Sequence, residues 1–320
     1  MNAASWHDHL PGEARVQLDL AGLVTFYDTQ LAPSLVPVRA GQERWDHRVQ
    51  NISSEDLSAA KARLEGALTG QNGLSSGIDW ATLIQVIVDR YARHLEFVRY
   101  LLNAPAVDPG DVLAIANNTQ IQLRIMLTPY LLLSVAPTSP PDESDLAWSA
   151  PVFRLCTTTH TYSMDSEPAV MTDSEKLILQ AIRGTTREIC RVVTKMWADG
   201  VQAGLDLLLN TKECPDVATV THLRDAWVEE LDHLMTWLDW GEWVKCDPAC
   251  APEVRRGVLS LPSAGKLMHG KQEVCYLPTW PVGFPGAEKI PYIGPLFPPV
   301  TDEWIRPHPS CIRRVAPYGF

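Results

Sequence analysis

The amino-acid sequence predicts a mainly α-helical protein, with a helical, bundle-like body over residues 1–240 and a proline-rich, loop-dominated segment over residues 241–320. Apolar residues recur at three- and four-residue intervals through the body, as on one face of a helix. Thirteen of the 25 prolines fall after residue 240, where they remove backbone donors and interrupt helices and sheets. The chain shows no alternation of strands with helices and no glycine-rich phosphate loop, so neither a Rossmann nor a P-loop site is expected.

Three helices are predicted in the first part of the body. Ala14–Leu31 is the first. Ser54–Leu68 follows, because serines at its start are N-cap residue types and a glutamate lies in its first turn. Asp79–Leu102 is the third, since Asp79 can cap it and its apolar residues repeat at helical spacing. Those apolar residues are Leu83, Ile84, Ile87, Tyr91, Leu95, Val98 and Leu102.

The second part of the body contains two long helical segments separated by a linker. Asp111–Leu133 is mostly apolar and is predicted as a buried helix. Residues 137–171 include a Ser-Pro-Pro-Asp run and are predicted as the linker. Asp173–Trp197 is predicted as a long helix that Gly200 interrupts and Val201–Leu209 continues.

The acidic charge of the protein is concentrated in the body. The whole chain has 27 Lys and Arg against 38 Asp and Glu, a net charge of −11. Residues 1–240 hold 18 basic and 31 acidic residues, a net charge of −13, whereas residues 241–320 hold 9 and 7, a net charge of +2. This balance excludes a protein coated in positive charge for general nucleic-acid binding.

Neither a signal peptide nor a membrane span is expected. Met1–Leu10 contains two histidines and an aspartate and no apolar stretch of signal-peptide length. The longest aliphatic run, around Tyr130–Val135, is far shorter than the roughly 20 residues that a membrane span requires. We therefore expect a cytoplasmic protein without a membrane partner, whose seven cysteines are reduced by default.

A row of cations is predicted on the helix that follows Asp173. Arg183, Arg187, Arg191 and Lys195 are spaced four residues apart, which places them along one face. Like charges at this spacing repel and cost helix stability unless an anion compensates them. One interpretation is a track for the phosphates of tRNA. The other is a solvated face that pairs with acidic neighbours.

The last predicted helix, Val217–Trp240, has an acidic face. Asp225, Glu229 and Asp232 follow one another at helical spacing beside an apolar stripe. Such a face can receive a guanidinium or amine substrate through charge-assisted hydrogen bonds. It can equally be the solvent side of an amphipathic helix, or the partner of the arginine-bearing helix.

Two residues are candidates for acid–base catalysis. His94 lies among Arg90, Glu96 and other charged residues of Asp79–Leu102, and histidine titrates near neutrality. Glu188 lies between the arginines of the cationic row. Exposed pairs at four-residue spacing would explain the same residues without catalysis. A nucleophilic pair of Cys156 and His160 is the less favoured alternative, because no third residue is placed to orient it.

The tail contains four cysteines that have three possible states. Cys246 and Cys250 form a C-x3-C pair, and Cys275 and Cys311 follow. Four thiolates, or three with the imidazole of His308, can bind zinc tetrahedrally. The spacing differs from the usual paired C-x2-C pattern, so no metal is assigned, and disulfides or free buried thiols remain open.

Tryptophans are dense in the same region. They are Trp237, Trp240, Trp243, Trp280 and Trp304. Tryptophans at this density usually anchor loops onto a helical body, and the tail is therefore expected to pack on it. They can also line an aromatic pocket, for which Trp240 is the candidate substrate-binding residue.

Four sequence blocks carry a resemblance to a known family. The tail block, residues 238–250 and 273–281, reads L-D-W-x-x-W-x-K-C-x-P-A-C and E-V-C-Y-L-P-T-W-P. It resembles a large family of filamentous-fungal proteins, as do the blocks 78–91 and 184–191. Through this family the chain is similar to the fungal arginine-containing cyclodipeptide synthases. In the family the C-x3-C pair is followed almost at once by Glu-x-Cys, so residues 254–273 are predicted as an inserted surface loop or a translated intron.

The resemblance implies a tRNA-dependent enzyme of fungal secondary metabolism. Such a synthase condenses arginine from arginyl-tRNA with a second aminoacyl-tRNA to give a diketopiperazine, without ATP or another cofactor. No catalytic motif of those enzymes matches this chain residue by residue, so the resemblance assigns no catalytic role. The alternatives are a non-catalytic helical interaction protein that docks through its tail, or another small-molecule biosynthetic enzyme with a pocket for a cationic intermediate.

Overall fold

The computed structural model describes residues 19–42, 46–70, 75–131, 147–165, 171–205, 216–250, 273–276 and 308–313. Within these residues the protein is mainly α-helical, as predicted. The chain divides into two compact units. The helical unit comprises Asp19–Leu31 and Ser54–Trp243, and the second unit includes the described parts of Ala32–Ser53 and Val244–Phe320.

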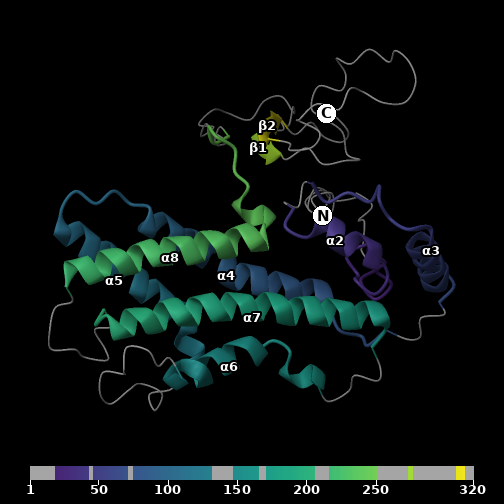
Figure 1. Ribbon diagram of the computed structural model, residues 1–320, viewed down its shortest axis with the longest axis horizontal. Coiled ribbons are helices and arrows are strands. Elements are labelled where there is room, and N and C mark those ends of the chain that lie inside the picture. The colour runs from purple at the N-terminus through teal and green to yellow at the C-terminus, as the bar shows by residue number, and fades with distance from the viewer. Residues whose placement is uncertain are drawn as a thin grey trace, which may run out of the picture. The chain divides into compact units, whose positions relative to one another are not determined.

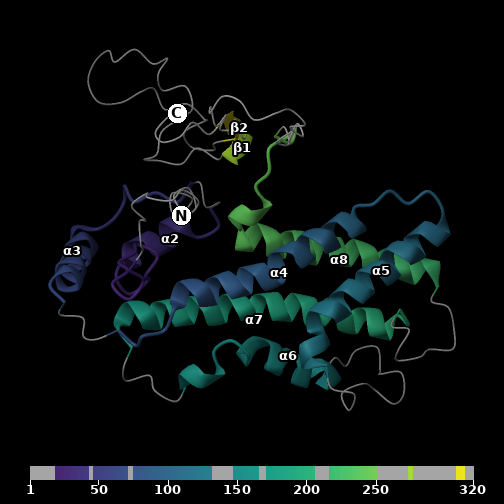
Figure 2. The ribbon, with the colours of Figure 1, turned by 180° about the vertical axis from the view of Figure 1, so that it is seen from behind.

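The helical unit is a bundle built around four long helices (Figure 1). These are α4 (Trp80–Leu102), α5 (Pro109–Leu127), α7 (Asp173–Gln202) and α8 (Val217–Leu238). Helix α7 contacts α8 on one side and the short helix α6 (Ala150–Thr158) on the other, an order that both views show (Figures 1 and 2). None of the described helices combines the length and the apolarity that crossing a bilayer requires.

Smaller elements complete the helical unit. They are α3 (Ser54–Leu68) and the 3-10 turns η3 (Thr128–Tyr130), η5 (Ala147–Ser149), η6 (Tyr162–Asp165) and η8 (Gly241–Trp243). The core contains fully buried aromatic side chains from three helices, Tyr91 of α4, Trp197 of α7 and Trp227 of α8. The predicted helices Ser54–Leu68, Asp79–Leu102 and Val217–Trp240 are thus confirmed to within two residues, and the helix predicted from Asp111 to Leu133 runs from Pro109 to Leu127.

Gly200 does not interrupt α7, contrary to the prediction. The helix runs through it to Gln202. Gly200 is buried where α5 crosses α7, and a Cβ at this position would collide with the side-chain amide of Gln120. That amide donates a hydrogen bond to the carbonyl of Trp197 at 3.0 Å. The glycine therefore permits a close approach of two helices and is not a helix stop.

The prediction of a linker over residues 137–171 is wrong where the structure describes that segment. Helix α6 lies within it and buries Val152 and Cys156, which are one turn apart. Cys156 is joined to Cys190 of α7 by a disulfide, so these two cysteines are not reduced as expected. A helix of only nine residues is marginal in isolation, so α6 depends on its packing against α7.

Residues 19–31 also differ from the prediction, since they form turns and no helix. Their backbone carbonyls instead accept hydrogen bonds from residues at the start of α7. Thr172 Oγ1 donates to the carbonyl of Ala21, and Ser174 Oγ donates to the carbonyl of Leu23, both at 2.8 Å. These two hydrogen bonds attach the turns of residues 19–31 to the start of α7.

The second unit contains little regular structure in its described part. It has the 3-10 turn η1 (Pro33–Leu35), the one-turn helix α2 (Val36–Arg39) and an antiparallel pair of strands, β1 (Glu273–Tyr276) and β2 (Ser310–Arg313). Of the predicted insertion, residues 254–272 lie outside the described residues. Trp243 belongs to the helical unit, and the packing of the tail on the body stays a prediction.

The helical unit is tied together at the start of α7 by the buried carboxylate of Glu175. Its side chain is 0% exposed and accepts hydrogen bonds from Ser75 Oγ, from the amide and hydroxyl of Ser76, from Trp80 Nε1 and from the amide of Thr172. Burial alone would raise the pKa of Glu175, but these hydrogen bonds outweigh it and bring the pKa to about 2. One carboxylate thus joins the starts of α4 and α7.

Substitution Glu175→Gln is expected to lower the free energy of unfolding at neutral pH by about 3 kcal/mol, because it mimics the protonated acid that these donors disfavour. The folded-state pKa is depressed from 4.5, so the wild-type stabilisation is complete above pH 4.5 and is lost as the pH falls toward 2. Urea unfolding followed by circular dichroism should therefore show the two proteins converging in acid. The exposed Glu55→Gln, in the first turn of α3, is the control and should cost less than about 0.5 kcal/mol; equal losses in both variants would contradict the role of the buried carboxylate.

Candidate functional site

The cationic row of α7 is formed as predicted, but two of its members are paired within the chain. Arg191 contacts Glu188 at 2.7 Å and Glu230 of α8 at 3.4 Å. Lys195 contacts Asp199 at 2.9 Å and Glu230 at 3.6 Å. The carboxylate of Glu230 therefore compensates the repulsion between neighbouring cations and links α7 to α8.

The other two cations of the row, Arg183 and Arg187, differ in exposure. Arg187 is exposed and makes no ion pair with any residue that the structure describes, and Arg183 is half-buried. Arg187 is therefore the accessible cation of the row, since the charges of Arg191 and Lys195 are compensated by Glu188, Asp199 and Glu230.

Glu188 is poorly suited to accept a proton. The hydrogen bond that Arg191 donates to it lowers its pKa, and the nearby charges of His233 and Arg187 add to this effect. A general base works best when its pKa lies near the working pH. In this arrangement Glu188 is a partner that holds Arg191.

The predicted acidic face of α8 is divided between different environments. Asp225 and Glu229 are exposed. Asp232 pairs with Arg99 of α4 at 3.1 Å, with both side chains about half exposed. Trp240 is partly buried against the core and stacks on Trp243, with ring centroids 5.3 Å apart. The structure therefore brings Asp232 and Trp240 close to residues of one cavity, and leaves Asp225 and Glu229 in solvent.

That cavity lies where the C-terminal end of α4 meets α8 and the turn η8. Its volume is about 390 Å³, within the range of small-molecule pockets. The lining combines aromatic rings, one carboxylate and the polar end of a helix. The lining residues are Glu96, Arg99, Tyr100, Asn103, Ala104, Pro105, Met235 and Trp243.

The walls of the cavity are fixed by long-range hydrogen bonds. Trp243 Nε1 donates to the carbonyl of Ala92 at 3.0 Å, which holds the indole against α4. Arg224 of α8 donates to the carbonyl of Leu102 at 2.6 Å and to that of Ala104 at 2.8 Å. The two bonds from Arg224 satisfy carbonyls at the C-terminal end of α4, which the helix itself leaves without partners.

The lining of the cavity carries one carboxylate, one guanidinium and two aromatic rings. The C-terminal end of α4 carries the negative end of the helix dipole. The guanidinium of Arg99 pairs with Asp232, and the carboxylate of Glu96 also has an interaction within the protein. The rings of Tyr100 and Trp243 offer aromatic faces, on which a guanidinium stacks favourably.

His94 does not belong to this cavity. It is half-buried on α4 and forms no hydrogen bond or ion pair with the residues that the structure describes. Successive helical residues are rotated by about 100°, so His94 lies on roughly the opposite side of α4 from Glu96. The spacing therefore argues against proton transfer by His94 at the cavity.

A second polar cluster is buried inside the bundle. The guanidinium of Arg90 lies over the rings of Tyr91 and Tyr130, at 5.5 and 5.1 Å, and the two tyrosine hydroxyls are 3.4 Å apart. Burial and the charge of Arg90 lower the pKa of His160, which favours its neutral form. Because Cys156 is 1% exposed and disulfide-bonded, the Cys156–His160 nucleophile interpretation is wrong.

The cysteines of the tail are the described residues that could hold a metal. The sulfur atoms of Cys246, Cys250 and Cys311 all lie within 4.8 Å of one another. Cys250 and Cys311 are joined by a disulfide, and Cys246 is also disulfide-bonded.

Sequence reasoning missed most of the cavity. The sequence patterns do not mark Tyr100 or Asn103 as site residues, and they mark Glu96 only as a neighbour of His94. Glu96, Tyr100 and Asn103 follow one another at intervals of four and three residues. That spacing was the available signal, but only the fold brings the indole of Trp243 to the same face of α4.

No protein family, no curated protein and no solved structure matches this chain.

The cavity is expected to bind arginine methyl ester and to discriminate against norleucine methyl ester, which lacks the guanidinium. Glu96→Gln should weaken binding of the arginine ester about tenfold, because a charge-assisted hydrogen bond contributes about 1.5–3 kcal/mol. Titration calorimetry measures both affinities. Glu229→Gln, an exposed carboxylate change on α8, is the matched control. Equal affinity for the two esters would contradict a cation site.

Proposed function

We propose that this protein is a tRNA-dependent cyclodipeptide synthase that condenses arginine from arginyl-tRNA with a second aminoacyl-tRNA to form a diketopiperazine. The cavity at the C-terminal end of α4 carries the proposal, because its aromatic walls and the carboxylate of Glu96 suit an arginine side chain. The resemblance of the tail block to the fungal family supports the same activity. Asp232 contributes by holding Arg99, and Trp240 by supporting Trp243.

The proposed reaction needs no nucleotide or redox cofactor. The amino group of one aminoacyl ester attacks the carbonyl carbon of the other, an amide forms, and the ester bond to tRNA breaks. The tRNA leaves as its terminal hydroxyl, which takes the proton lost by the amine. The free amine of the dipeptidyl ester then attacks its own ester carbonyl, which closes the ring and releases the second tRNA.

The contribution of the protein in this reaction is the positioning of both esters. Holding two reactants in attack geometry removes much of the entropic barrier of a bimolecular step. A seat for the guanidinium fixes one end of the arginyl group, and phosphate contacts to Arg183 and Arg187 fix the tRNA. In this proposal the cavity holds the cationic arginine side chain, and the basic residues of α7 hold the polyanionic tRNA.

Expression in a bacterial host should yield a new arginine-containing diketopiperazine. Extraction of the culture and mass spectrometry detect it, and feeding isotopically labelled arginine should shift the product by the mass of one labelled residue. A host that carries the empty vector is the control. Abundant soluble protein with no diketopiperazine would contradict the proposed activity and favour a different small-molecule enzyme or an interaction protein.

Neutralising Arg183 and Arg187 of α7 should weaken tRNA binding. The double variant Arg183→Gln, Arg187→Gln is expected to lower the affinity for arginyl-tRNA about tenfold, and to make its salt dependence less steep by about one to two counterions. Filter binding over a series of salt concentrations measures both. Arg93→Gln, an exposed arginine on α4, is the control. An unchanged salt slope in the double variant would remove the phosphate track from the proposal.

A further inference from the structure

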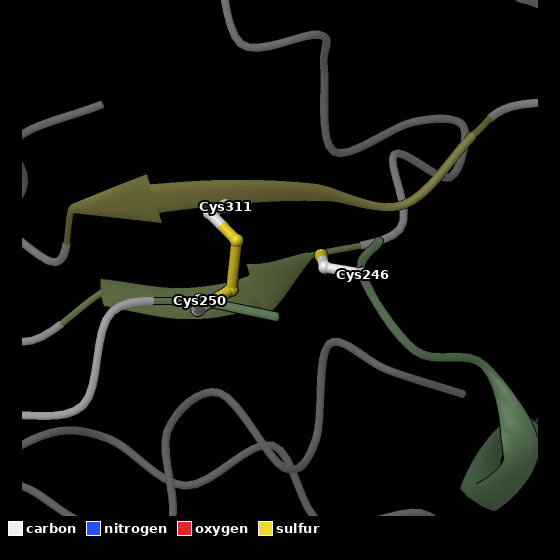
Figure 3. A group of neighbouring side chains, drawn as sticks. All are labelled: Cys246, Cys250 and Cys311. Atoms are coloured by element: carbon white, nitrogen blue, oxygen red, sulfur yellow. A yellow bond between two sulfur atoms is a disulfide. The ribbon is translucent and has the colours of Figure 1, made fainter. Parts of the chain in front are cut away.

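The cysteine cluster of the second unit brings together residues that are far apart in the sequence. Cys246 and Cys250 lie on the segment that follows the helical unit, and Cys311 lies on β2 (Figure 3). Their sulfur atoms are within 4.8 Å of one another, although Cys250 and Cys311 are 61 residues apart. Three sulfur atoms thus meet at one point of the unit.

Strand register adds a fourth cysteine at the same level of the sheet. In the antiparallel pair, Cys275 of β1 is directly opposite Cys311 of β2. Directly opposed residues of an antiparallel pair have Cβ atoms about 5 Å apart. The four tail cysteines therefore come from three segments, the C-x3-C turn and the two strands.

This arrangement matches the requirements of a structural zinc ion. Zinc takes four thiolates tetrahedrally with Zn–S distances of about 2.3 Å, so its sulfur ligands are about 3.8 Å apart. The sulfur atoms of Cys246, Cys250 and Cys311 lie within 4.8 Å of one another, two of them bonded in the Cys250–Cys311 disulfide, so reduction frees them to separate to that spacing. A donor set made only of thiolates also selects zinc over magnesium or calcium, which prefer oxygen.

A cross-link would stabilise the strand pair of the second unit. Its sheet has two strands of four residues each, and an isolated pair of strands is at best marginally stable in water. Small units without a large core are commonly held by metals or disulfides. A single zinc would connect the turn and both strands at once, whereas each disulfide connects only two points.

We infer that Cys246, Cys250, Cys275 and Cys311 bind one zinc ion when reduced, and that the Cys250–Cys311 disulfide is the oxidised, metal-free form of the same site. Reduction of each disulfide consumes two molecules of a monothiol such as glutathione, which leave as their own disulfide. The four protein thiols then lose four protons as they bind the zinc ion. This site is independent of the proposed synthase activity.

Metal analysis tests the assignment on the full chain, reduced with glutathione and supplied with zinc under anaerobic conditions. About one zinc per chain is expected in the wild type, and less than about a fifth of that in Cys250→Ser and Cys311→Ser. Cys214→Ser, which removes the one cysteine that belongs neither to this cluster nor to the Cys156–Cys190 disulfide, is the control and should keep its zinc. A reduced wild type that binds no zinc, or Ser variants that keep it, would overturn the proposal.

Cobalt substitution keeps the test decisive if the serine variants fail to fold. The reduced wild type should bind one cobalt ion and show both the intense visible bands of tetrahedral cobalt and thiolate-to-metal charge transfer in the near ultraviolet. Addition of peroxide should abolish both signals as the disulfides form. Cobalt bound without thiolate charge transfer would show that the cysteines are not the ligands.

Discussion

The hydrogen-bonded carboxylate of Glu175 is the interaction on which the helical unit depends. A buried charge without a cationic partner is normally costly, and here five donors replace its hydration. Those donors belong to the chain before α4, to Trp80 at its first turn and to the cap of α7. Since helices are stiff, fixing the starts of α4 and α7 also sets where their far ends lie. The cavity is at the far end of α4, about 35 Å from its start at 1.5 Å per residue.

A second constraint is the charge balance between α7 and α8. The repulsion within the cationic row is relieved by Glu230, which contacts both Arg191 and Lys195. The acidic helix is thus partly the partner of the basic one, an alternative that the sequence already indicated. The same pairing limits what the row can offer to an anion, because Arg191 and Lys195 are already held in ion pairs.

Much of the helical body could be predicted from the sequence, because its signals are local. The apolar repeat of α4 and the N-cap at Asp79 lie within one segment, and the structure confirms both. Helix α6 and the role of Gly200 could not be predicted in the same way. The first is stabilised by packing on α7, and the second reflects the neighbouring side chain of Gln120 on α5. Neither partner is visible to a periodicity argument.

The candidate site was predicted less completely than the fold for the same reason. Asp232 was chosen for its charge, yet its partner in the structure is Arg99, 133 positions earlier in the chain. The sequence marks Trp243 as one of the dense tryptophans and as part of the tail block, but its position depends on the carbonyl of Ala92. Charge patterns identify which helices have ionic faces, but they do not identify which ions neutralise one another. The aromatic and acidic cavity arises only when α4, α8 and η8 are brought together.

The central claim is that this cavity seats the side chain of the arginyl group. The most direct measurement is the in vitro conversion of tRNA charged with labelled arginine, comparing wild type with Glu96→Gln. The account predicts a labelled cyclodipeptide from the wild type that requires intact charged tRNA. It predicts at least a tenfold lower yield from the variant, with the affinity for tRNA itself unchanged. Equal yields from the two proteins would contradict it.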